Sequence, residues 1–217
     1  MIMKILDFSL PYHSDDSKII GAGIMPFAIK DRRVYVLLGQ EDSDGRFGVF
    51  GGRMKPGCDE QETAICEFHE ETMGAVLDRN LVTKLLAMRM YTLKFTGAAG
   101  VNRFFITYML RIPWDPSLPE KFQRQRSALL HGDFTNVPDA FDEKTCRVKY
   151  DFVEKRSVAW FPFDELAGIA LRSRWNHPVI GMDGTPMFRR PFLAGLNNLV
   201  QYFNVPLFLK DLAWCDS

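Results

Sequence analysis

The 217-residue sequence has no surplus of either charge, because 27 lysines and arginines balance 27 aspartates and glutamates. A protein that holds long nucleic acid through its phosphates usually carries a basic surplus, so this balance argues against RNA or DNA as the main partner. The sequence is also poor in cysteine, and its four cysteines form no CxxC pair and have no histidine cluster beside them. That spacing argues against a zinc site.

The sequence also lacks a long hydrophobic run and a secretory signal. Its first residues, MIMKILDFSLPYH, are only mildly apolar and are soon followed by two aspartates. A membrane-spanning helix needs about 20 consecutive apolar residues. We therefore expect a cytoplasmic protein that has no membrane partner.

Apolar residues are abundant, at 47% of the chain, and their order predicts an α/β fold. A chain of this length and composition can bury a substantial core, and we expect a single domain over residues 1–217. Runs rich in apolar residues predict strands at 19–29, 33–38, 85–95, 103–112 and 160–163. A short helix is predicted at 164–170, and apolar spacing predicts a C-terminal helix at about 189–204.

The least regular segment is the excursion at about 113–151, which contains four prolines and intermixed charges. A connection of this length is uncommon inside a compact domain. It is either an ordered functional insertion or a partly disordered segment. A helix is predicted within residues 119–130.

Three glutamates, Glu67, Glu70 and Glu71, are spaced i, i+3 and i+4. An α-helix with this spacing places them on one face, where like charges repel. A hard divalent cation such as Mg²⁺ or Mn²⁺ removes that conflict, because it prefers oxygen ligands. The alternative interpretation is a solvated helix face.

The residues before these glutamates favour the ligand-site interpretation. A strand-like stretch at 47–50 leads into Gly51 and Gly52, and a Pro-Gly pair follows at 56–57. We expect a loop here, in which glycines let the backbone approach a ligand closely. Arg53 could hold a phosphate oxygen by a charge-assisted hydrogen bond, with a plain surface arginine as the alternative.

Residues 52–74 resemble the Nudix box, G-x5-E-x7-R-E-U-x-E-E-x-G-U, where U is an aliphatic residue. Gly52 takes the first position, Glu67 the glutamate after the arginine, and Glu70 and Glu71 the final pair. The resemblance implies an α/β/α sandwich with a central mixed sheet. It also implies that these three glutamates bind Mg²⁺ or Mn²⁺ and that one of them can act as a base.

The activity implied by the resemblance is hydrolysis of a pyrophosphate, or phosphoanhydride, bond in a nucleoside diphosphate linked to another group. Nudix proteins generally set substrate choice outside the box, which favours an ordered functional excursion at 113–151. Several Nudix enzymes carry a further carboxylate just before a strand that begins with tryptophan. Glu154, six residues before Trp160, resembles that residue. Asp151 is the second candidate, and a solvated glutamate beside Lys155 is the alternative.

The box departs from the family pattern at three positions. Cys58 and Cys66 stand where the family has a glutamate and an arginine, so both partners of an ion pair are missing together. Replacing both partners can be nearly neutral for stability. We therefore expect a repacked junction between loop and helix, with a disulfide as the alternative. Met73, before Gly74, is expected to lengthen the helix or tighten its exit.

The substrate stays open between a small nucleotide and an RNA cap. A nucleotide base could stack on Phe27, Phe47 or Phe50, although these are otherwise core residues. The run at 172–177, followed by two arginines at 189–190, interleaves basic and aromatic residues as nucleic-acid contacts do. The segments GAGIMPFAI, VYVLLGQE and EFHEETMG also resemble Nudix proteins of large DNA viruses, which fits the cap-hydrolase alternative.

A second class of function is a Nudix-fold binding or scaffold protein without catalysis. Such proteins usually lose box glutamates, whereas this chain keeps all three. Catalysis is therefore the favoured expectation. A homodimer is compatible with the abundant phenylalanine and methionine, but no residue pattern requires it.

Overall fold

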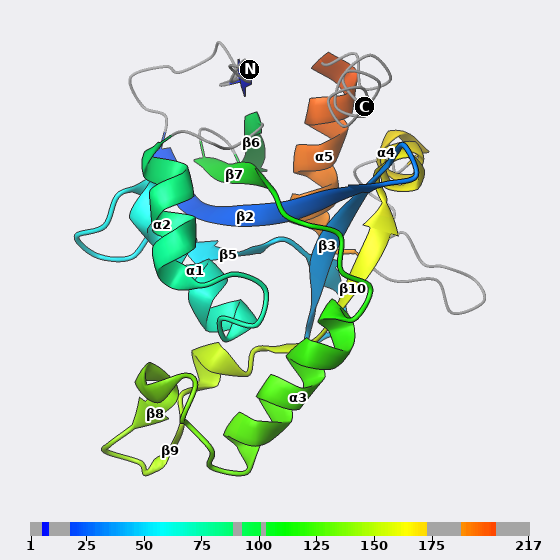
Figure 1. The fold of residues 1–217 in the computed structure, drawn as a ribbon. Coiled ribbons are helices and arrows are strands. Elements are labelled where there is room, and N and C mark those ends of the chain that lie inside the picture. The colour runs from blue at the N-terminus through cyan, green and yellow to red at the C-terminus, as the bar shows by residue number, and fades with distance from the viewer. Residues whose placement is uncertain (1–5, 9–17, 89–92, 101–102, 173–187, 203–217) are drawn as a thin grey trace.

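The computed structural model describes residues 6–8, 18–88, 93–100, 103–172 and 188–202 (Figure 1). The strands are β1 (Leu6–Phe8), β2 (Lys18–Lys30), β3 (Arg33–Glu41), β4 (Phe47–Gly48), β5 (Phe50–Arg53), β6 (Leu93–Gly100), β7 (Arg103–Arg111), β8 (Phe141–Asp142), β9 (Arg147–Val148) and β10 (Lys155–Pro162). The helices are α1 (Glu60–Thr72), α2 (Arg79–Ala87), α3 (Leu118–Leu130), α4 (Phe163–Arg172) and α5 (Arg190–Tyr202), with 3-10 turns η1 (Pro138–Ala140) and η2 (Tyr150–Phe152).

Eight of these strands form one mixed sheet in the order β1-β6-β7-β2-β3-β10, with β4 paired to β3 and β5 paired to β2. β1 and β6 are parallel, as are β2 and β7, whereas the other pairs of this sheet are antiparallel. The long strand β2 contacts β7, β3 and β5 and so lies at the centre of the sheet (Figure 1).

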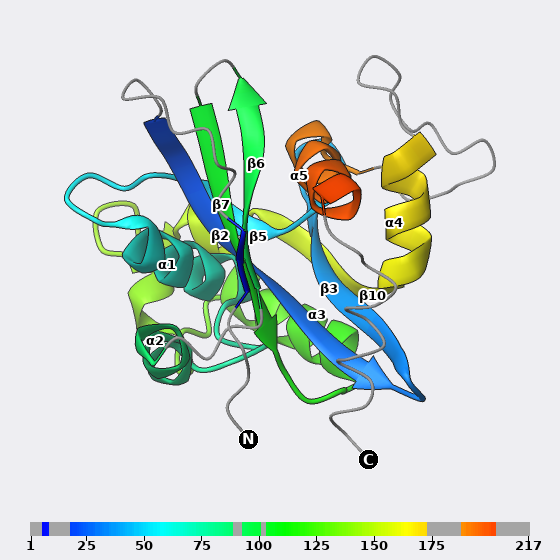
Figure 2. The ribbon, with the colours of Figure 1, turned by 90° about the horizontal axis from the view of Figure 1, so that it is seen from above.

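Helices cover both faces of the sheet (Figure 2). Side chains alternate along β2: Ala22 and Ile24 pack with α1, α2 and α3, whereas Met25 and Phe27 pack with α4 and α5. Successive residues of a strand point to opposite faces, so one strand supplies both cores. The predicted α/β class, with a mixed sheet between helices, is confirmed.

Several predicted elements agree with the structure. Strand β2 covers the strand predicted at 19–29, and α4 covers the helix predicted at 164–170. Helix α5 occupies Arg190–Tyr202, while residues 203 and 204 of the predicted C-terminal helix lie outside the described residues. No helix within the described ranges is long and apolar enough to cross a membrane.

The predicted strand at 85–95 is wrong over its first residues, which end helix α2, whereas residues 93–95 belong to β6 and residues 89–92 lie outside the described residues. Asp78 caps α2 by accepting hydrogen bonds from the backbone N–H groups of Asn80 and Leu81. Val82 and Leu86, one helical turn apart, are fully buried. The predicted connection at 97–100 also belongs to β6.

The expected loop at Gly51 and Gly52 is wrong as well, because both residues lie in strand β5 and pair with β2. A Cβ on Gly51 would lie 2.4 Å from Gly23 Cα, and a Cβ on Gly23 would lie 2.4 Å from Phe50 O. The two strands therefore approach closely because glycines face each other. The predicted strand at 160–163 also begins earlier, at Lys155.

The excursion at 113–151 contains the predicted helix, α3. It forms the lower part of the molecule in Figure 1. Phe122 and Leu129 of α3 belong to the core shared with α1 and α2. Arg126 Nε donates to Lys155 O at 3.0 Å, which fixes α3 against the start of β10.

We expect Phe122→Ala to lower the free energy of unfolding by about 3–5 kcal/mol, because truncating a fully buried aromatic side chain leaves a cavity. Leu130→Ala on the same helix is the control, since Leu130 is 51% exposed and should change stability by less than about 0.5 kcal/mol. Urea denaturation measures both values. Equal, small effects would show that α3 is not part of the cooperative core.

Candidate active site

Helix α1 presents its glutamates to strand β5. The helix starts with a capping box, in which Asp59 Oδ1 accepts from Glu62 N at 2.8 Å and Glu62 Oε2 accepts from Asp59 N at 3.0 Å. Ala64, Ile65 and Phe68 are buried in the core and fix the rotation of the helix about its axis. The three box glutamates then lie on the side of α1 that faces the sheet edge at β5.

The helix ends abruptly after Thr72. Met73 adopts a left-handed conformation, with φ 55°, and its N–H donates to Glu70 O. A side chain at positive φ is uncommon and usually replaced by glycine, but Met73 is buried, at 2% exposure. Of the two outcomes expected for Met73, the exit turn is tightened and the helix is not lengthened.

A cavity of about 300 Å³ lies between α1, β5 and the start of β10, and the predicted site residues surround it. Its lining consists of Gly51, Gly52, Arg53, Glu67, Glu70, Glu71, Asp151, Glu154 and Arg189. Both candidates for the additional carboxylate, Glu154 and Asp151, therefore reach the same space. Five carboxylates around one small cavity form a strongly acidic site.

Glu71 is held at the base of this cavity by two internal donors. Its Oε2 accepts from Gly51 N at 2.7 Å, and its Oε1 lies 2.8 Å from Lys155 Nζ. Lys155 also donates to Glu41, which in turn accepts from Arg189 Nη1 at 2.7 Å. The side chains of Lys155, Glu41 and Glu71 are at most 3% exposed.

Sequence reasoning missed Glu41 and Lys155. In the sequence, Lys155 stands out only as a neighbour of Glu154, whereas its side chain is completely buried in the structure. The two residues face each other across β3 and β10, where Lys155 pairs with Glu41 in the strand register. That signal is visible only once the pairing of the two strands is known.

The outer carboxylates, Glu67 and Glu70, meet a second lysine. Lys55 Nζ lies 2.6 Å from Glu70 Oε2 and 3.4 Å from Glu67 Oε1. An ammonium group among carboxylate oxygens occupies a position that suits a cation. The donor set therefore fits Mg²⁺ or Mn²⁺, which both prefer hard oxygen ligands.

Burial changes the protonation of the acidic groups. It raises the pKa of Glu71 to about 8, although Lys155 opposes the shift. Burial also raises the pKa of Glu67 and of half-buried Glu154, and in both cases a nearby lysine opposes the change. A carboxyl group with a raised pKa keeps its proton to a higher pH, so protons compete with a cation for these oxygens.

The two box cysteines are free thiols in the structure, in place of the alternative disulfide. Arg79 of α2 donates from Nη2 to Cys66 Sγ at 3.3 Å. Partial burial raises the pKa of the Cys66 thiol, which favours its neutral form. At the junction between the loop and α1, Arg79 contacts Cys66 and Lys55 contacts Glu67 and Glu70. The Nudix box pattern would place a glutamate and an arginine at positions 58 and 66 of this junction.

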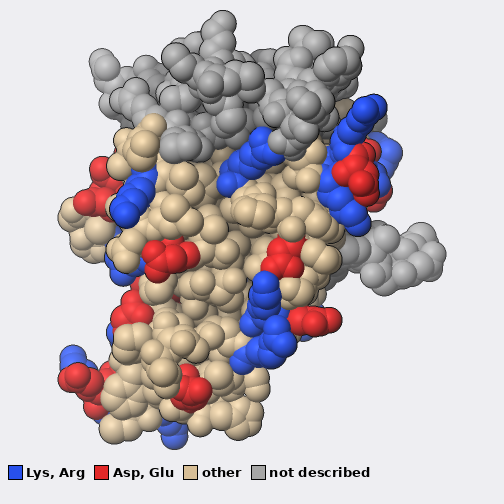
Figure 3. Space-filling model, viewed as in Figure 1, with Lys and Arg blue, Asp and Glu red and all other residues tan. Residues whose placement is uncertain are grey.

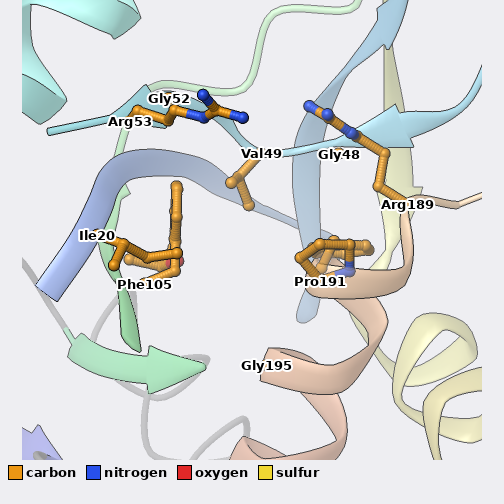
Figure 4. Close-up of a pocket in the computed structure, with 12 residues that line it drawn as sticks. Ile20, Gly48, Val49, Gly52, Arg53, Phe105, Arg189, Pro191 and Gly195 are labelled. Atoms are coloured by element: carbon orange, nitrogen blue, oxygen red, sulfur yellow. The ribbon is translucent and has the colours of Figure 1, made fainter. Parts of the chain in front are cut away.

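A second, mostly apolar pocket of about 200 Å³ adjoins the acidic cavity (Figure 4). The two share four lining residues, Gly51, Gly52, Arg53 and Arg189. Ile20 and Phe105 line one side of the pocket and Pro191 at the start of α5 the other (Figure 4). Arg53 and Arg189 extend toward each other from opposite sides of the pocket (Figure 4).

The three phenylalanines considered for base stacking are core residues. Phe27, Phe47 and Phe50 are 0%, 8% and 0% exposed, and none of them lines either cavity. The aromatic residues that do line the apolar pocket are Phe105 of β7 and Phe192 of α5. The position of Phe105 follows from the parallel pairing of β2 and β7, in which Gly21 faces Phe105.

The basic and aromatic run at 172–177 lies outside the described residues except for Arg172, which ends α4. On the face shown in Figure 3, lysines and arginines lie in separate groups, several of them beside acidic residues. The described part of this face therefore carries no continuous basic band of the kind that tracks a nucleic-acid backbone.

No family profile matches the chain, and no curated protein sequence is similar to it. A C. elegans Ap4A hydrolase binary complex aligns with a TM-score of 0.43 and 12% identity, over 87% of this chain and 96% of that one. The Nudix hydrolase RenU from M. smegmatis aligns with a TM-score of 0.43 and 12% identity, over 86% of each chain. The NUDIX domain of Shewanella oneidensis NrtR, complexed with ADP ribose, aligns with a TM-score of 0.37 and 14% identity, over 73% of this chain and 82% of that one. Values this low do not assign a function.

The two glycines of β5 predict contrasting mutant effects. A Cβ on Gly52 would lie 2.3 Å from Glu67 Oε2, the end of a flexible side chain, whereas a Cβ on Gly51 would meet the backbone of β2. We expect Gly52→Ala to displace Glu67 and weaken Mg²⁺ binding while the melting temperature stays near that of the wild type. Gly51→Ala should lower stability by about 1–3 kcal/mol. Calorimetric Mg²⁺ titration measures the effect of Gly52→Ala, and thermal unfolding measures the effect of Gly51→Ala. Unchanged Mg²⁺ affinity in Gly52→Ala would contradict this placement of Glu67.

The raised carboxyl pKa values predict that Mg²⁺ binds more weakly at about pH 6 than at about pH 8. At the lower pH the cation must displace a proton from Glu67, and a protonated Glu154 adds no negative charge to the cavity; each proton released changes the affinity by up to about tenfold per pH unit. Calorimetric titrations in two buffers of different ionisation enthalpy count the protons. Equal affinity at both pH values, with no proton release, is the opposing result.

Proposed function

We propose that this protein hydrolyses a phosphoanhydride bond in a nucleotide-type substrate, a nucleoside diphosphate linked to another group, with Mg²⁺ or Mn²⁺ as cofactor. The observation that carries the proposal is the acidic cavity beside an apolar pocket, with Arg53 and Arg189 on the boundary that the two share. A diphosphate needs cations and positive side chains, whereas the organic group attached to it needs an apolar surface. The acidic cavity and its arginines can bind the diphosphate and its cation, and the adjoining apolar pocket can bind the organic group.

The cofactor would be held by carboxylates of α1. Glu67 and Glu70 face the cavity with side chains 15% and 21% exposed, and Glu71 lies beneath them. Lys55 contacts both outer glutamates and must move aside when a cation binds; at 28% exposure it can reach solvent. A bound divalent cation supplies positive charge that offsets the negative charge developing on the phosphate oxygens during cleavage.

The protein's own side chains bind and orient the substrate. Arg53 and Arg189 extend toward each other and can donate charge-assisted hydrogen bonds to phosphate oxygens (Figure 4). Ile20, Phe105 and Pro191 offer an apolar surface to a ring system. Ring stacking against Phe105 would orient a nucleotide base in this pocket.

Proton transfer is assigned to Glu154, which is half-buried at the entrance to β10 and lines the acidic cavity. A carboxylate oxygen of Glu154 accepts a proton from water as the water oxygen forms a bond to one phosphorus. The bond between that phosphorus and the bridging oxygen breaks, and the second phosphate leaves with the bridging oxygen. Burial brings the pKa of this carboxyl group closer to neutral pH, which suits a general base.

The test is a panel of nucleotide sugars, ADP-ribose, dinucleoside polyphosphates, nucleoside triphosphates and capped RNA, incubated with Mg²⁺ or Mn²⁺ and resolved by chromatography. We expect cleavage of a small diphosphate compound to two phosphorus-containing products. Preferential cleavage of capped RNA would assign the cap-hydrolase alternative. Binding of a ligand that is recovered unchanged would assign the scaffold alternative.

Glu70→Gln should lower the metal-dependent rate by about 100-fold or more, because it removes a charged oxygen from the cation site while keeping the shape of the side chain. Glu120→Gln is the matched control, since Glu120 is an exposed glutamate in the first turn of α3. The control should retain the wild-type rate and melting temperature. Full activity of Glu70→Gln would overturn the assignment of the metal site.

A further inference from the structure

The base of the acidic cavity is electrically balanced by the protein itself. Two buried carboxylates, Glu41 and Glu71, meet two cationic side chains, Lys155 and Arg189. The outer carboxylates are balanced only in part, because Lys55 is the one cationic side chain among the described residues that forms an ion pair with Glu67 and Glu70. The negative charge that attracts a cation is therefore concentrated on the outer side.

Lys155 lies where a metal ion would otherwise be expected. One carboxylate oxygen from each of Glu41, Glu71 and Glu154 lies within 4.8 Å of the others, an arrangement that could hold a cation. Lys155 Nζ contacts two of these three residues, Glu41 and Glu71. An ammonium group donates up to three hydrogen bonds and carries one positive charge, so it satisfies buried oxygens as a cation does.

The surrounding residues are built to hold this lysine in place. Its side chain is fully buried, and a Cβ on Gly39 of β3 would lie 3.1 Å from Lys155 Cδ and Cγ. Glycine at this position therefore leaves room for the aliphatic part of the lysine. Lys55 differs, because it reaches its glutamates from the loop before α1 and is partly exposed. Lys55, at 28% exposure, can be displaced by a cation, whereas the Lys155 side chain is completely buried.

We propose that Lys155 is a positioning residue that takes the place of a divalent cation among Glu41, Glu71 and Glu154. It fixes Glu71 against Gly51 and confines metal binding to the outer oxygens of the cavity, those of Glu67 and Glu70. This inference rests on the proposed metal-dependent function, since it states where in that site the cation binds. The inference adds that one positive charge of the site is the ammonium group of Lys155 and not a metal ion.

Lys155→Met tests the proposal, because methionine fills a similar volume without charge. The number of Mn²⁺ ions bound per protein is measured by electron paramagnetic resonance titration. We expect the variant to bind one more Mn²⁺ than the wild type, since Glu71 and Glu154 then lack a compensating charge. Mn²⁺ should also raise the melting temperature of the variant more than that of the wild type, because the ion replaces a buried partner.

Two further variants serve as controls. The double variant Lys155→Met, Glu71→Gln removes the negative charge of Glu71 together with the positive charge of Lys155. It should bind the same number of Mn²⁺ ions per protein as the wild type. Lys55→Met removes the displaceable lysine, and it should bind the wild-type number of ions with higher affinity. A purely structural role of Lys155 would lower stability without changing the count.

The wild-type number of Mn²⁺ ions in folded Lys155→Met would overturn the proposal. A variant that stays unfolded in millimolar Mn²⁺ would overturn it too, because the ion then fails to replace the ammonium group. Folding that requires Mn²⁺ would support it. The number of Mn²⁺ ions bound per protein does not depend on hydrolysis. A wild-type protein that cleaves no diphosphate would therefore refute the proposed function, and the number of bound Mn²⁺ ions would still test the role of Lys155.

Discussion

The site depends on the buried ion pairs of Lys155 with Glu41 and Glu71. Removing charges from water is costly, and the cost is offset only when every charged oxygen and nitrogen finds a partner in good geometry. Here Gly51 N–H and Arg189 complete the set. The same few contacts join β3, β10, α1 and β5 to the residue that precedes α5. Chain segments that are distant in sequence are thereby held in one geometry around the cavity.

This network explains how one small region serves two chemical demands. The carboxylates of α1 and Glu154 lie on the acidic side, and Phe105 and Pro191 lie on the apolar side. Arg53 and Arg189 belong to both. A substrate with a charged diphosphate and a ring system would span the boundary, with its phosphates between the arginines. Arg189 has the further task of pairing with Glu41, so its position is fixed before a substrate arrives.

The parts of the site that residue spacing predicts are local, whereas the remote Glu154 and Asp151 were indicated only by the family resemblance. The i, i+3 and i+4 spacing of Glu67, Glu70 and Glu71 specifies one helix face from residues that are close together in the chain. Lys155, Phe105 and Arg189 could not be predicted in the same way, because strand register and helix docking bring them to the site. Arg189, for example, contacts a glutamate 148 positions earlier in the chain. The double glycine was misread as a loop because its reason, close approach of β5 to β2, is also a tertiary contact.

The most direct test of this account is a crystal structure of the wild-type protein with Mn²⁺ and a non-hydrolysable methylene diphosphate analogue of a nucleotide, with Mn²⁺ located by anomalous scattering. The account predicts Mn²⁺ in contact with Glu67 or Glu70 and with the diphosphate, Lys155 still between Glu41 and Glu71, and the base in the apolar pocket beside Phe105. Mn²⁺ bound in place of the Lys155 ammonium group, or a diphosphate bound away from the α1 glutamates, would contradict it.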